Sequence, residues 1–467
     1  MSIALLNVVC EHIKERRYDK PNYPDPSLGA VFSYLKKSNI ECYVIDSKLR
    51  RMNLGRIIER IRQIRPQVIG FTSFTHEIER VASVARTING EFQNAKLIIG
   101  GAHANAMPGE VLSEFPIFDI AIFGEGEQTL VELVRNDFRN LESIQGMAYR
   151  KGADIIVNKP RPFLDIENIP ATDWTEFPKA RYYPIFTSRG CPYKCVFCSR
   201  PFGSKIRHRP VESIIQEIEQ TKKLFSPRMI YFWDENFCID RTKTINLLEQ
   251  IRKNKEIKDI KWFCQTHINH LDYELLRLMK ESGCKRIGIG IESGNEEVLR
   301  RICKDTNKDR IIQIVKWLKK VKIPFEGYFL LGLPDENWET CVETIKFATK
   351  LNPTFPVFGI AVPYPGTEIY NMARRGEGGY KLIATNWSDY NKLIGKAVEL
   401  TGLSRRQLEI LQLYGYVSVL VKNLRIIDIV RFIFQYGVDI RFYIINFLSN
   451  FKIKDRDNKQ SYANRTN

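Results

Sequence analysis

Three cysteines within eight residues have the clearest chemical meaning in this sequence: Cys191, Cys195 and Cys198, spaced C-x3-C-x2-C. Three thiolates on one short loop can bind three irons of a 4Fe-4S cluster and leave the fourth iron without a protein ligand. That open iron can coordinate a substrate or a cofactor. The alternative, a structural zinc site, needs a fourth nearby ligand, and the next Cys or His along the chain is His208. The spacing favours a 4Fe-4S cluster with one open iron.

The same motif has an aromatic residue, Phe197, directly before its last cysteine. In this form it resembles the signature of the radical S-adenosylmethionine (radical SAM) superfamily. The resemblance implies that the open iron is chelated by the amino and carboxylate groups of S-adenosylmethionine. One electron from the cluster would then cleave this molecule to a 5′-deoxyadenosyl radical. An external reductant such as flavodoxin or ferredoxin is implied as a partner.

Polar residues and glycines at later strand ends extend the resemblance, because family members contact S-adenosylmethionine at these places. They are Asp234 and Glu235 for the methionine amino group, Glu292 and Ser293 for the ribose and methionine, and Gly332 and Pro363 for the adenine. Each motif also has a structural interpretation. The first two carboxylates could cap a helix, Glu292 could form an ion pair, and Gly332 could permit a tight turn.

The cysteine motif follows the first of six predicted strands, each but the last followed by a helical pattern. The strands are expected at 183–187, 229–233, 261–265, 286–291, 325–331 and 357–361. Six β/α units fall short of the eight in a complete barrel, so we expect an open, partial (β/α)6 TIM-type barrel. Its site should lie at the carboxyl ends of the strands, and the radical SAM core is expected to span 183–370.

A first series of strands and helices precedes this barrel and occupies 1–142. Strands at 3–9, 41–45, 68–71, 96–99 and 120–123 alternate with helical patterns, which predicts a doubly wound parallel sheet. No G-x-G-x-x-G follows the first strand, so dinucleotide binding is not expected. The loops after the later strands instead resemble those of cobalamin-binding domains. The residues that carry this resemblance are Thr72, Thr75, Gly100, Gly101, His103, Gly124 and Glu125.

One departure concerns the lower ligand of cobalt. Many cobalamin domains carry Asp-x-His-x-x-Gly after the first strand, whereas this chain has Glu11 and His12 without that motif. We therefore expect cobalamin to bind without a histidine on cobalt. For His103, a capping or hydrogen-bonding role is favoured over cobalt ligation.

Two further regions complete the chain. Prolines punctuate 143–182, which predicts a linker with a hairpin near 147–157. Residues 371–467 read as a helical C-terminal region with a frayed basic tail. Its amphipathic stretches at 404–421 and 426–451 could pack over the barrel and close the pocket. They could also contact an anionic membrane from which a lipid substrate is taken.

Composition places the whole chain among folded proteins of a reducing compartment. The 467 residues carry a net charge of +17, and the ten cysteines are too sparse for a disulfide scaffold. No apolar run reaches the length of a membrane span, and the N-terminus lacks secretory-signal features. We expect a cytoplasmic enzyme with peripheral contact at the inner membrane face as an option, and no nucleic-acid partner.

Together the two resemblances point to cobalamin-dependent radical SAM enzymes, in the branch with anaerobic magnesium-protoporphyrin ester cyclase and the cobalamin-dependent methylases. The activity implied is methylation of an unactivated carbon of a small-molecule or lipid-like substrate. Alternatives are a cobalamin-linked radical cyclase or rearranging oxidoreductase without methyl transfer, a tRNA methylthiotransferase and a non-enzymatic cobalamin or redox sensor. Methylthiotransferases hold a second cluster on three N-terminal cysteines, but only Cys10 and Cys42 precede the triad here.

Overall fold

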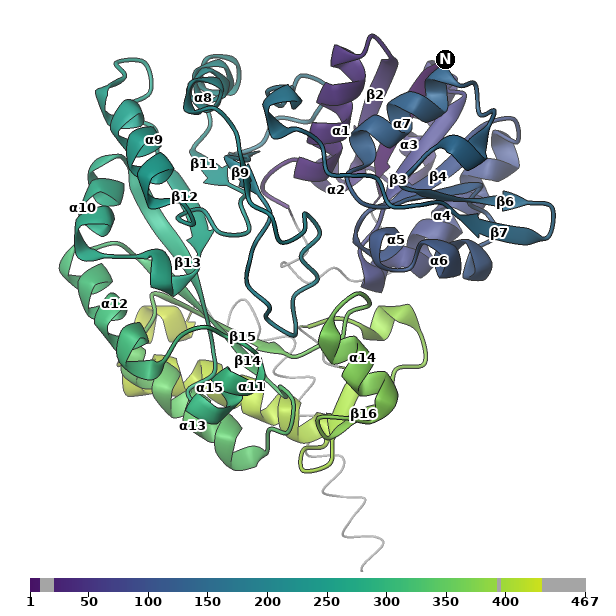
Figure 1. Cartoon of the computed structure of the whole chain (residues 1–467). Helices are drawn as coiled ribbons and strands as arrows, with labels where there is room; N and C mark the ends of the chain where they lie inside the picture. Colours follow the sequence, from purple (N-terminus) through teal and green to yellow (C-terminus); the bar gives the residue numbers. More distant parts are fainter. Residues whose placement is uncertain (9–20, 393–395, 431–467) are drawn as a thin grey trace, which may run out of the picture.

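The computed structural model of the protein describes residues 1–8, 21–392 and 396–430. They form two large β-sheets, each with helices packed on it, followed by a mainly helical C-terminal part (Figure 1). The α/β architecture predicted from the sequence is confirmed. The loop that contains Glu11 and His12 lies outside the described residues.

Five strands form the parallel part of the first sheet, in the order β2-β1-β3-β4-β5 with β2 at one edge. They are β1 (Ser2–Asn7), β2 (Glu41–Asp46), β3 (Val68–Thr72), β4 (Lys96–Gly100) and β5 (Ile120–Ile122). Every residue of β1 is buried, as expected for a central strand with helices on both faces. The strand order reverses between β1 and β3, and sheets of this kind bind ligands at the carboxyl ends of strands beside such a point.

Helices cover both faces of this sheet. They are α1 (Pro26–Lys37), α2 (Ser47–Arg50), α3 (Leu54–Ile64), α4 (Ile78–Glu91), α5 (Ala102–Ala106), α6 (Pro108–Glu114) and α7 (Gly126–Arg135). The start of α1 is encoded locally: the Asp25 carboxylate accepts hydrogen bonds from the backbone N–H groups of Ser27 and Leu28, and Pro26 is the first helical residue.

The second sheet has six parallel strands among the described residues, in the order β15-β14-β13-β12-β11-β8. They are β8 (Tyr182–Ile185), β11 (Met229–Phe232), β12 (Trp262–Thr266), β13 (Cys284–Glu292), β14 (Phe325–Leu331) and β15 (Phe355–Ile360). The connecting helices are α8 (Val211–Phe225), α9 (Arg241–Lys253), α10 (Tyr273–Glu281), α11 (Glu296–Arg301), α12 (Lys308–Lys320) and α13 (Trp338–Leu351). The predicted open barrel of six units is confirmed.

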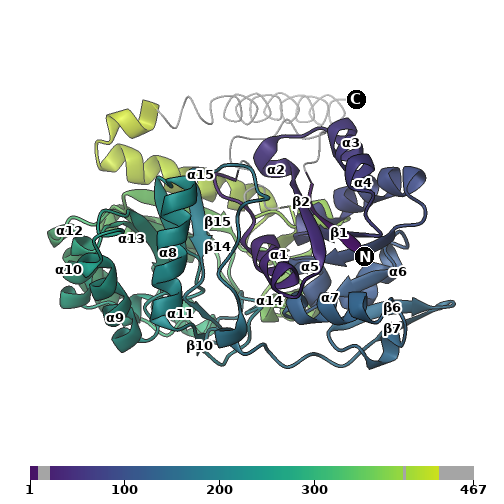
Figure 2. The ribbon, with the colours of Figure 1, turned by 90° about the horizontal axis from the view of Figure 1, so that it is seen from above.

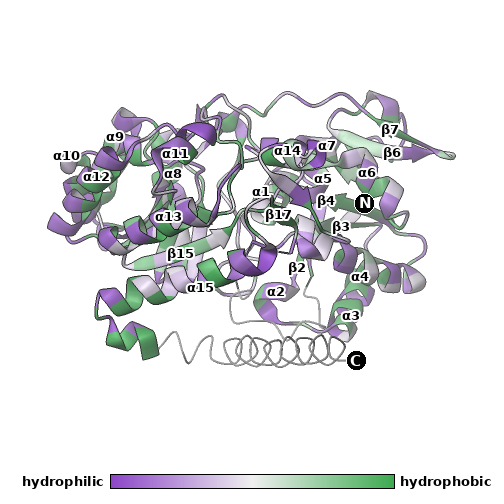
Figure 3. Cartoon of the chain, turned by 90° about the horizontal axis from the view of Figure 1, so that it is seen from below, coloured by the Kyte–Doolittle hydropathy of each residue, from purple (hydrophilic) through white to green (hydrophobic). Residues whose placement is uncertain are grey.

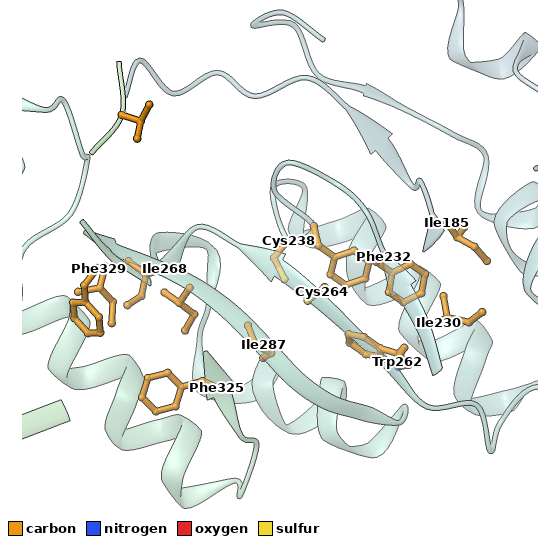
Figure 4. Packing of buried hydrophobic residues seen from close by; sticks show 14 of the residues in the cluster. Ile185, Ile230, Phe232, Cys238, Trp262, Cys264, Ile268, Ile287, Phe325 and Phe329 are labelled. Atoms are coloured by element: carbon orange, nitrogen blue, oxygen red, sulfur yellow. The ribbon is translucent and has the colours of Figure 1, made fainter. Parts of the chain in front are cut away.

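Alternate residues of the barrel strands form the core between sheet and helices (Figure 4). Ile230 and Phe232 on β11, Trp262 and Cys264 on β12, and Ile287 on β13 are all at most 1% exposed. This two-residue period follows from strand geometry, in which successive side chains point to opposite faces. The other face of the sheet is thereby left for the site.

The predicted linker at 143–182 is partly built into the first sheet. Strand β6 (Met147–Lys151) pairs antiparallel with β5 and forms a hairpin with β7 (Asp154–Val157), so the predicted hairpin is confirmed. The first sheet thus extends beyond residue 142, because the hairpin covers the edge that β5 would otherwise expose. Further along, the buried Trp174 ring lies only 2.4 Å from where a Cβ on Gly29 of α1 would stand.

The C-terminal part comprises α14 (Glu368–Arg375), a two-stranded sheet of β16 (Tyr380–Leu382) and β17 (Val398–Leu400), and α15 (Arg405–Lys422). Helix α15 runs along β15 (Figure 2): Gln412 donates a hydrogen bond of 2.8 Å to the carbonyl oxygen of Phe358. The predicted helix at 404–421 is confirmed. Most of the predicted helix at 426–451 lies outside the described residues. Across the described part of the chain, we find no helix with the length and hydropathy of a membrane span.

The connector should contribute strongly to stability through Trp174. We expect Trp174→Ala to lower the free energy of unfolding by about 3–5 kcal/mol, since it leaves a cavity between α1 and the barrel. Urea denaturation followed by circular dichroism measures the change. Val157→Ala, at a half-exposed position on β7, is the control and should have little effect. Equal effects of the two substitutions would contradict the packing role of Trp174.

Candidate radical SAM and cobalamin sites

The cluster loop, residues 190–198, follows β8 and the short strand β9 (Ser188–Arg189), which pairs with β10 (Arg207–His208). The Cys191 N–H donates to the carbonyl oxygen of Gly203 at 3.0 Å, and the Val196 N–H donates to that of Ile302 at 3.2 Å. The loop is therefore fixed to the end of α11 and to the segment that precedes β10. Phe197 packs against the core of the barrel.

The three cysteines of this loop are free thiols with raised pKa values. Burial raises the pKa of Cys195 to about 11, and it raises the pKa values of Cys191 and Cys198 as well; the positive charge of Lys304 opposes each rise. Three cysteines on one loop fit a 4Fe-4S cluster, because its cysteine ligands bind three different irons.

The two carboxylates after β11 have different surroundings. The Asp234 carboxylate accepts hydrogen bonds from the N–H groups of Thr187 (2.7 Å) and Ser188 (3.1 Å), and from the Thr187 hydroxyl. Asp234 therefore fixes the backbone that leads into the cluster loop. Glu235 accepts one bond from the Gly190 N–H at 2.8 Å, and its Oε1 atom is buried without a partner. Burial, supported by the charge of Asp234, raises the pKa of Glu235 to about 7.

A buried ion pair lies at the end of β13. The Lys304 Nζ atom is 3.1 Å from Oε1 of Glu292, and both side chains are less than 10% exposed. Both Glu235 and Lys304 lie near the cluster loop: Glu235 accepts from the Gly190 N–H, and Lys304 directly follows Cys303, whose carbonyl is 3.9 Å from the Cys195 sulfur. An ammonium and a carboxylate with a free oxygen complement the carboxylate and amino groups of a methionine moiety. Ser293 is committed elsewhere: its hydroxyl oxygen lies 3.0 Å from that of Thr344.

The remaining predicted barrel residues lie at the ends of β14 and β15. Gly332 has a φ of +82° and its N–H donates to Glu336 at 2.9 Å, while its carbonyl accepts from the Tyr380 hydroxyl at 3.0 Å. A Cβ on Gly332 would stand 3.1 Å from Leu408 of α15, so the positive φ and this tight approach both favour glycine here. Pro363 follows β15 and is buried.

In the first domain, the predicted glycines divide into two kinds. A Cβ on Gly101, whose φ is +90°, would stand 2.6 Å from the backbone nitrogen of Ser73, so this glycine serves close packing of the loops after β3 and β4. A Cβ on Gly100 would meet only the Phe71 carbonyl at 3.8 Å, and one on Gly124 would meet nothing within 4 Å. Thr72 pairs with Gly100 in register. These open positions at the carboxyl edge fit a bulky nucleotide tail such as that of cobalamin.

Two other predicted residues of this domain are buried. Thr75 begins the short helix η2 (Thr75–Glu77). His103 is 1% exposed, burial lowers its pKa to about 4, and its Nδ1 atom has no partner. The imidazole ring of His103 and the indole of Trp387 pack in a T-shaped arrangement, with 4.8 Å between the ring centroids. His103 is thus a neutral imidazole covered by the C-terminal part of the chain.

The last of the seven residues predicted to contact cobalamin, Glu125, has a different role. Its two carboxylate oxygens accept hydrogen bonds from Arg189 at 2.8 Å, from Arg207 at 2.9 Å and from the Leu164 N–H at 2.6 Å. Arg189 also donates to Glu127 at 2.8 Å. We call these four charged residues the docking network. It occupies the Glu125 carboxylate and joins the carboxyl edge of the first sheet to the start of the cluster loop.

Comparisons with known proteins agree with this two-domain site. The B12 binding domain family matches residues 20–134, and the Radical SAM superfamily matches residues 185–348. An uncharacterised methyltransferase of Pyrococcus horikoshii is 30% identical, over 85% of this chain and 90% of its own length. The anaerobic magnesium-protoporphyrin IX monomethyl ester cyclase of Rubrivivax gelatinosus is 26% identical, over 79% of this chain and 69% of its own.

Solved structures share the fold. The radical SAM methyltransferase TsrM of Kitasatospora setae, solved with cobalamin and a 4Fe-4S cluster, superimposes with a TM-score of 0.69 at 18% identity, over 84% of each chain. OxsB, with aqua-cobalamin and S-adenosylmethionine bound, gives 0.66 at 20% identity, over 76% of this chain and 53% of its own. The chain belongs to the B12-binding radical SAM enzymes. The expectation of a 4Fe-4S cluster, S-adenosylmethionine and cobalamin as cofactors is confirmed.

Sequence reasoning missed three cationic residues of the site. Arg189 and Arg207 hold Glu125, and Lys304 pairs with Glu292. Arg189 stands two residues before Cys191, but its partner Glu125 is 64 residues away, and no local pattern connects them. The two arginine pairs are revealed only by the packing of the two domains, and the Lys304–Glu292 pair only by how the chain folds back after α11.

The triad should be necessary for the cluster. Anaerobically reconstituted protein should hold about four irons and four sulfides per chain, and replacing Cys191, Cys195 and Cys198 together with Ala should abolish them. Iron analysis and visible absorbance measure this. Cys303→Ala is the matched control: Cys303 is exposed and near the loop, since its carbonyl lies 3.9 Å from the Cys195 sulfur. Full absorbance in the triple variant would refute the assignment.

The docking network should stabilise the folded chain at neutral pH. Glu125→Gln removes one partner of a buried ion pair, and we expect it to lower the free energy of unfolding by about 3 kcal/mol. Urea denaturation at neutral pH measures the change. The control is Glu249→Gln, which breaks an exposed pair with Lys253 and should have no measurable effect.

The docking network also predicts how the stability difference between wild type and Glu125→Gln depends on pH. Burial acts to raise the pKa of Glu125, but hydrogen bonds and charge from Arg207 and Arg189 hold it below the ordinary glutamate value. The stabilisation is therefore complete above about pH 5 and is lost as pH falls through the lowered pKa. Wild type and Glu125→Gln should converge only in acid. A difference that persists unchanged at the lowest pH would contradict this electrostatic origin.

Proposed function

We propose that this enzyme is a C-methyltransferase that methylates an unactivated carbon of a small-molecule or lipid-like substrate. The observation that supports it most directly is the docking network, which joins the two cofactor-bearing edges. Arg189 stands at the start of the cluster loop, and Glu125 directly follows Gly124, one of the two open glycines of the first sheet. A substrate between these edges would face both cofactors.

When bound, the cluster supplies the electron that cleaves S-adenosylmethionine to methionine and a 5′-deoxyadenosyl radical, and cobalamin supplies the methyl group. The chain's own residues bind and orient. Glu235 and Lys304 offer opposite charges to the methionine moiety. Asp234 holds the backbone of Thr187 and Ser188 rigid beside them. Gly100 and Gly124 leave room for the corrin's nucleotide tail.

The relatives support two reaction types. The 30% identical relative is named a methyltransferase, as are two bacteriochlorophyllide-methylating proteins of Chlorobaculum tepidum at 27% identity. The second candidate is a radical cyclase or rearranging oxidoreductase, which the 26% identity to the anaerobic ester cyclase favours. Either reaction needs a one-electron reductant, for which a flavodoxin or ferredoxin is the expected class.

The products of S-adenosylmethionine distinguish these two reactions. We expect the reduced, cobalamin-loaded enzyme with its substrate to form both 5′-deoxyadenosine and S-adenosylhomocysteine, because hydrogen abstraction and methyl donation each consume one molecule. A cyclase would form 5′-deoxyadenosine without S-adenosylhomocysteine. Liquid chromatography of anaerobic reactions measures both products. Formation of neither product would overturn the proposal.

One variant should affect cobalamin binding without affecting the iron–sulfur cluster. Gly100→Leu should reduce corrin retention about tenfold or more, because its side chain occupies the tail's space, and it should leave the iron content unchanged. Gly90→Leu, at an equally open glycine of α4, is the control. Undiminished corrin binding by Gly100→Leu would contradict the placement of the tail.

A further inference from the structure

Helix α15 and the turn after it expose a row of large apolar side chains. We call this row the apolar ridge; exposure ranges from 37% for Leu413 to 83% for Leu424. Its members are Ile410, Leu413, Tyr414, Val417, Val421, Leu424, Ile426, Ile427 and Val430. In Figure 3 the chain directly after α15 is coloured hydrophobic at the margin of the molecule. The spacing up to Leu424 follows one face of a helix.

The ridge is unusual because the opposite face of α15 is already in the core. Leu408, Leu411 and Val419 are fully buried, and a Cβ on Gly415 would stand 2.9 Å from the Phe358 ring. Nine of the 17 exposed large apolar residues in the described ranges belong to the ridge, so it is a concentration rather than normal scatter. A helix that is apolar on both faces needs a second apolar environment on its outer side.

The charges around the ridge are basic. Both acidic residues of the segment are neutralised by ion pairs, Glu409 with Arg405 and Asp428 with Arg425. Lys422 is exposed beside Val421. Over 401–467 the sequence has 11 Lys and Arg against 5 Asp and Glu, and residues beyond 430 continue with many apolar side chains. This combination attracts anionic surfaces and repels a basic partner.

We propose that the apolar ridge binds the surface of an anionic lipid bilayer, with α15 lying in the plane of the interface. Apolar side chains flanked by Lys and Arg suit the boundary between headgroups and acyl chains. The helix lies on the membrane rather than across it, since α15 does not qualify as a span. Its inner face on β15 would hold the barrel against the membrane. This inference goes beyond the proposed reaction and concerns where the enzyme takes up its substrate.

Vesicle flotation tests the proposal with the anaerobically prepared, cluster-loaded full chain. We expect the protein to float with vesicles of phosphatidylcholine and phosphatidylglycerol, and to float much less with phosphatidylcholine alone. High salt should weaken binding because it screens the basic residues. Absence of flotation with anionic vesicles at low salt would overturn the proposal, and it is also the result expected if the chain's own residues beyond 430 cover the ridge.

Variants locate the binding surface. Val421→Asp with Leu424→Asp should lower the vesicle partition coefficient about tenfold or more, because two apolar contacts become anionic. The control is Leu224→Asp on α8, a leucine outside the ridge that is 49% exposed, close to the 52% of Val421. Iron content and circular dichroism should be the same in all three proteins. An equal loss of vesicle binding in Leu224→Asp would overturn the assignment of the apolar ridge as the binding surface.

Lys422→Glu adds an electrostatic test, because it should weaken binding to anionic vesicles only. The rival occupant is a second copy of the chain. If wild type forms a concentration-dependent dimer by sedimentation velocity, the Val421→Asp and Leu424→Asp variant abolishes it, and neither protein floats, the ridge is a self-association surface and the membrane proposal is wrong.

Discussion

The buried contact between Arg189 and the carboxylates of Glu125 and Glu127 is the constraint on which the arrangement of this enzyme depends. A guanidinium with 3% of its side-chain surface exposed is tolerable only when it is paired, because the cost of removing its hydration is large. Glu127 is at the start of α7 in the first domain, and Glu125 precedes that helix. Separation of the domains would strand these charges, so the two sheets are held in one relative position. The cluster loop begins at Gly190, the residue after Arg189.

Because the docking network uses Glu125, the acidic residues of the site have different roles. Three carboxylates at strand ends, Glu125, Asp234 and Glu235, look alike in sequence as cofactor contacts. The structure commits Glu125 to docking and Asp234 to the backbone before the cluster loop. Glu235 alone of these three keeps a carboxylate oxygen without a partner. Two of these three carboxylates therefore hold the protein structure, and one is left to contact a ligand, as expected where precise geometry has to be maintained.

What the sequence could reveal follows from the range of each interaction. Apolar runs and strand-end glycines are local patterns, so the strands, the open barrel, the cysteine loop and the crevice glycines were predictable. The extent of the first sheet was not, because β6 joins it only by pairing with β5 across the predicted linker. Lys304 likewise follows α11 without any local signature, and its pairing with Glu292 depends on how the chain folds back. Long-range charge pairing is decided by tertiary packing.

The C-terminal part supplies a third connection between the two domains. The Tyr380 hydroxyl binds the carbonyl of Gly332 at the end of β14, and the Trp387 indole donates to Glu114 while its ring covers His103. One short segment thus touches the carboxyl-end region of both sheets. Because the sheets are committed to the cofactors, we expect substrate selectivity to depend on this segment and on the loops beside it. The docking network joins the two domains on one side, and the C-terminal segment contacts both of them as well. A change in the C-terminal part can therefore alter the cofactor geometry without touching either cofactor.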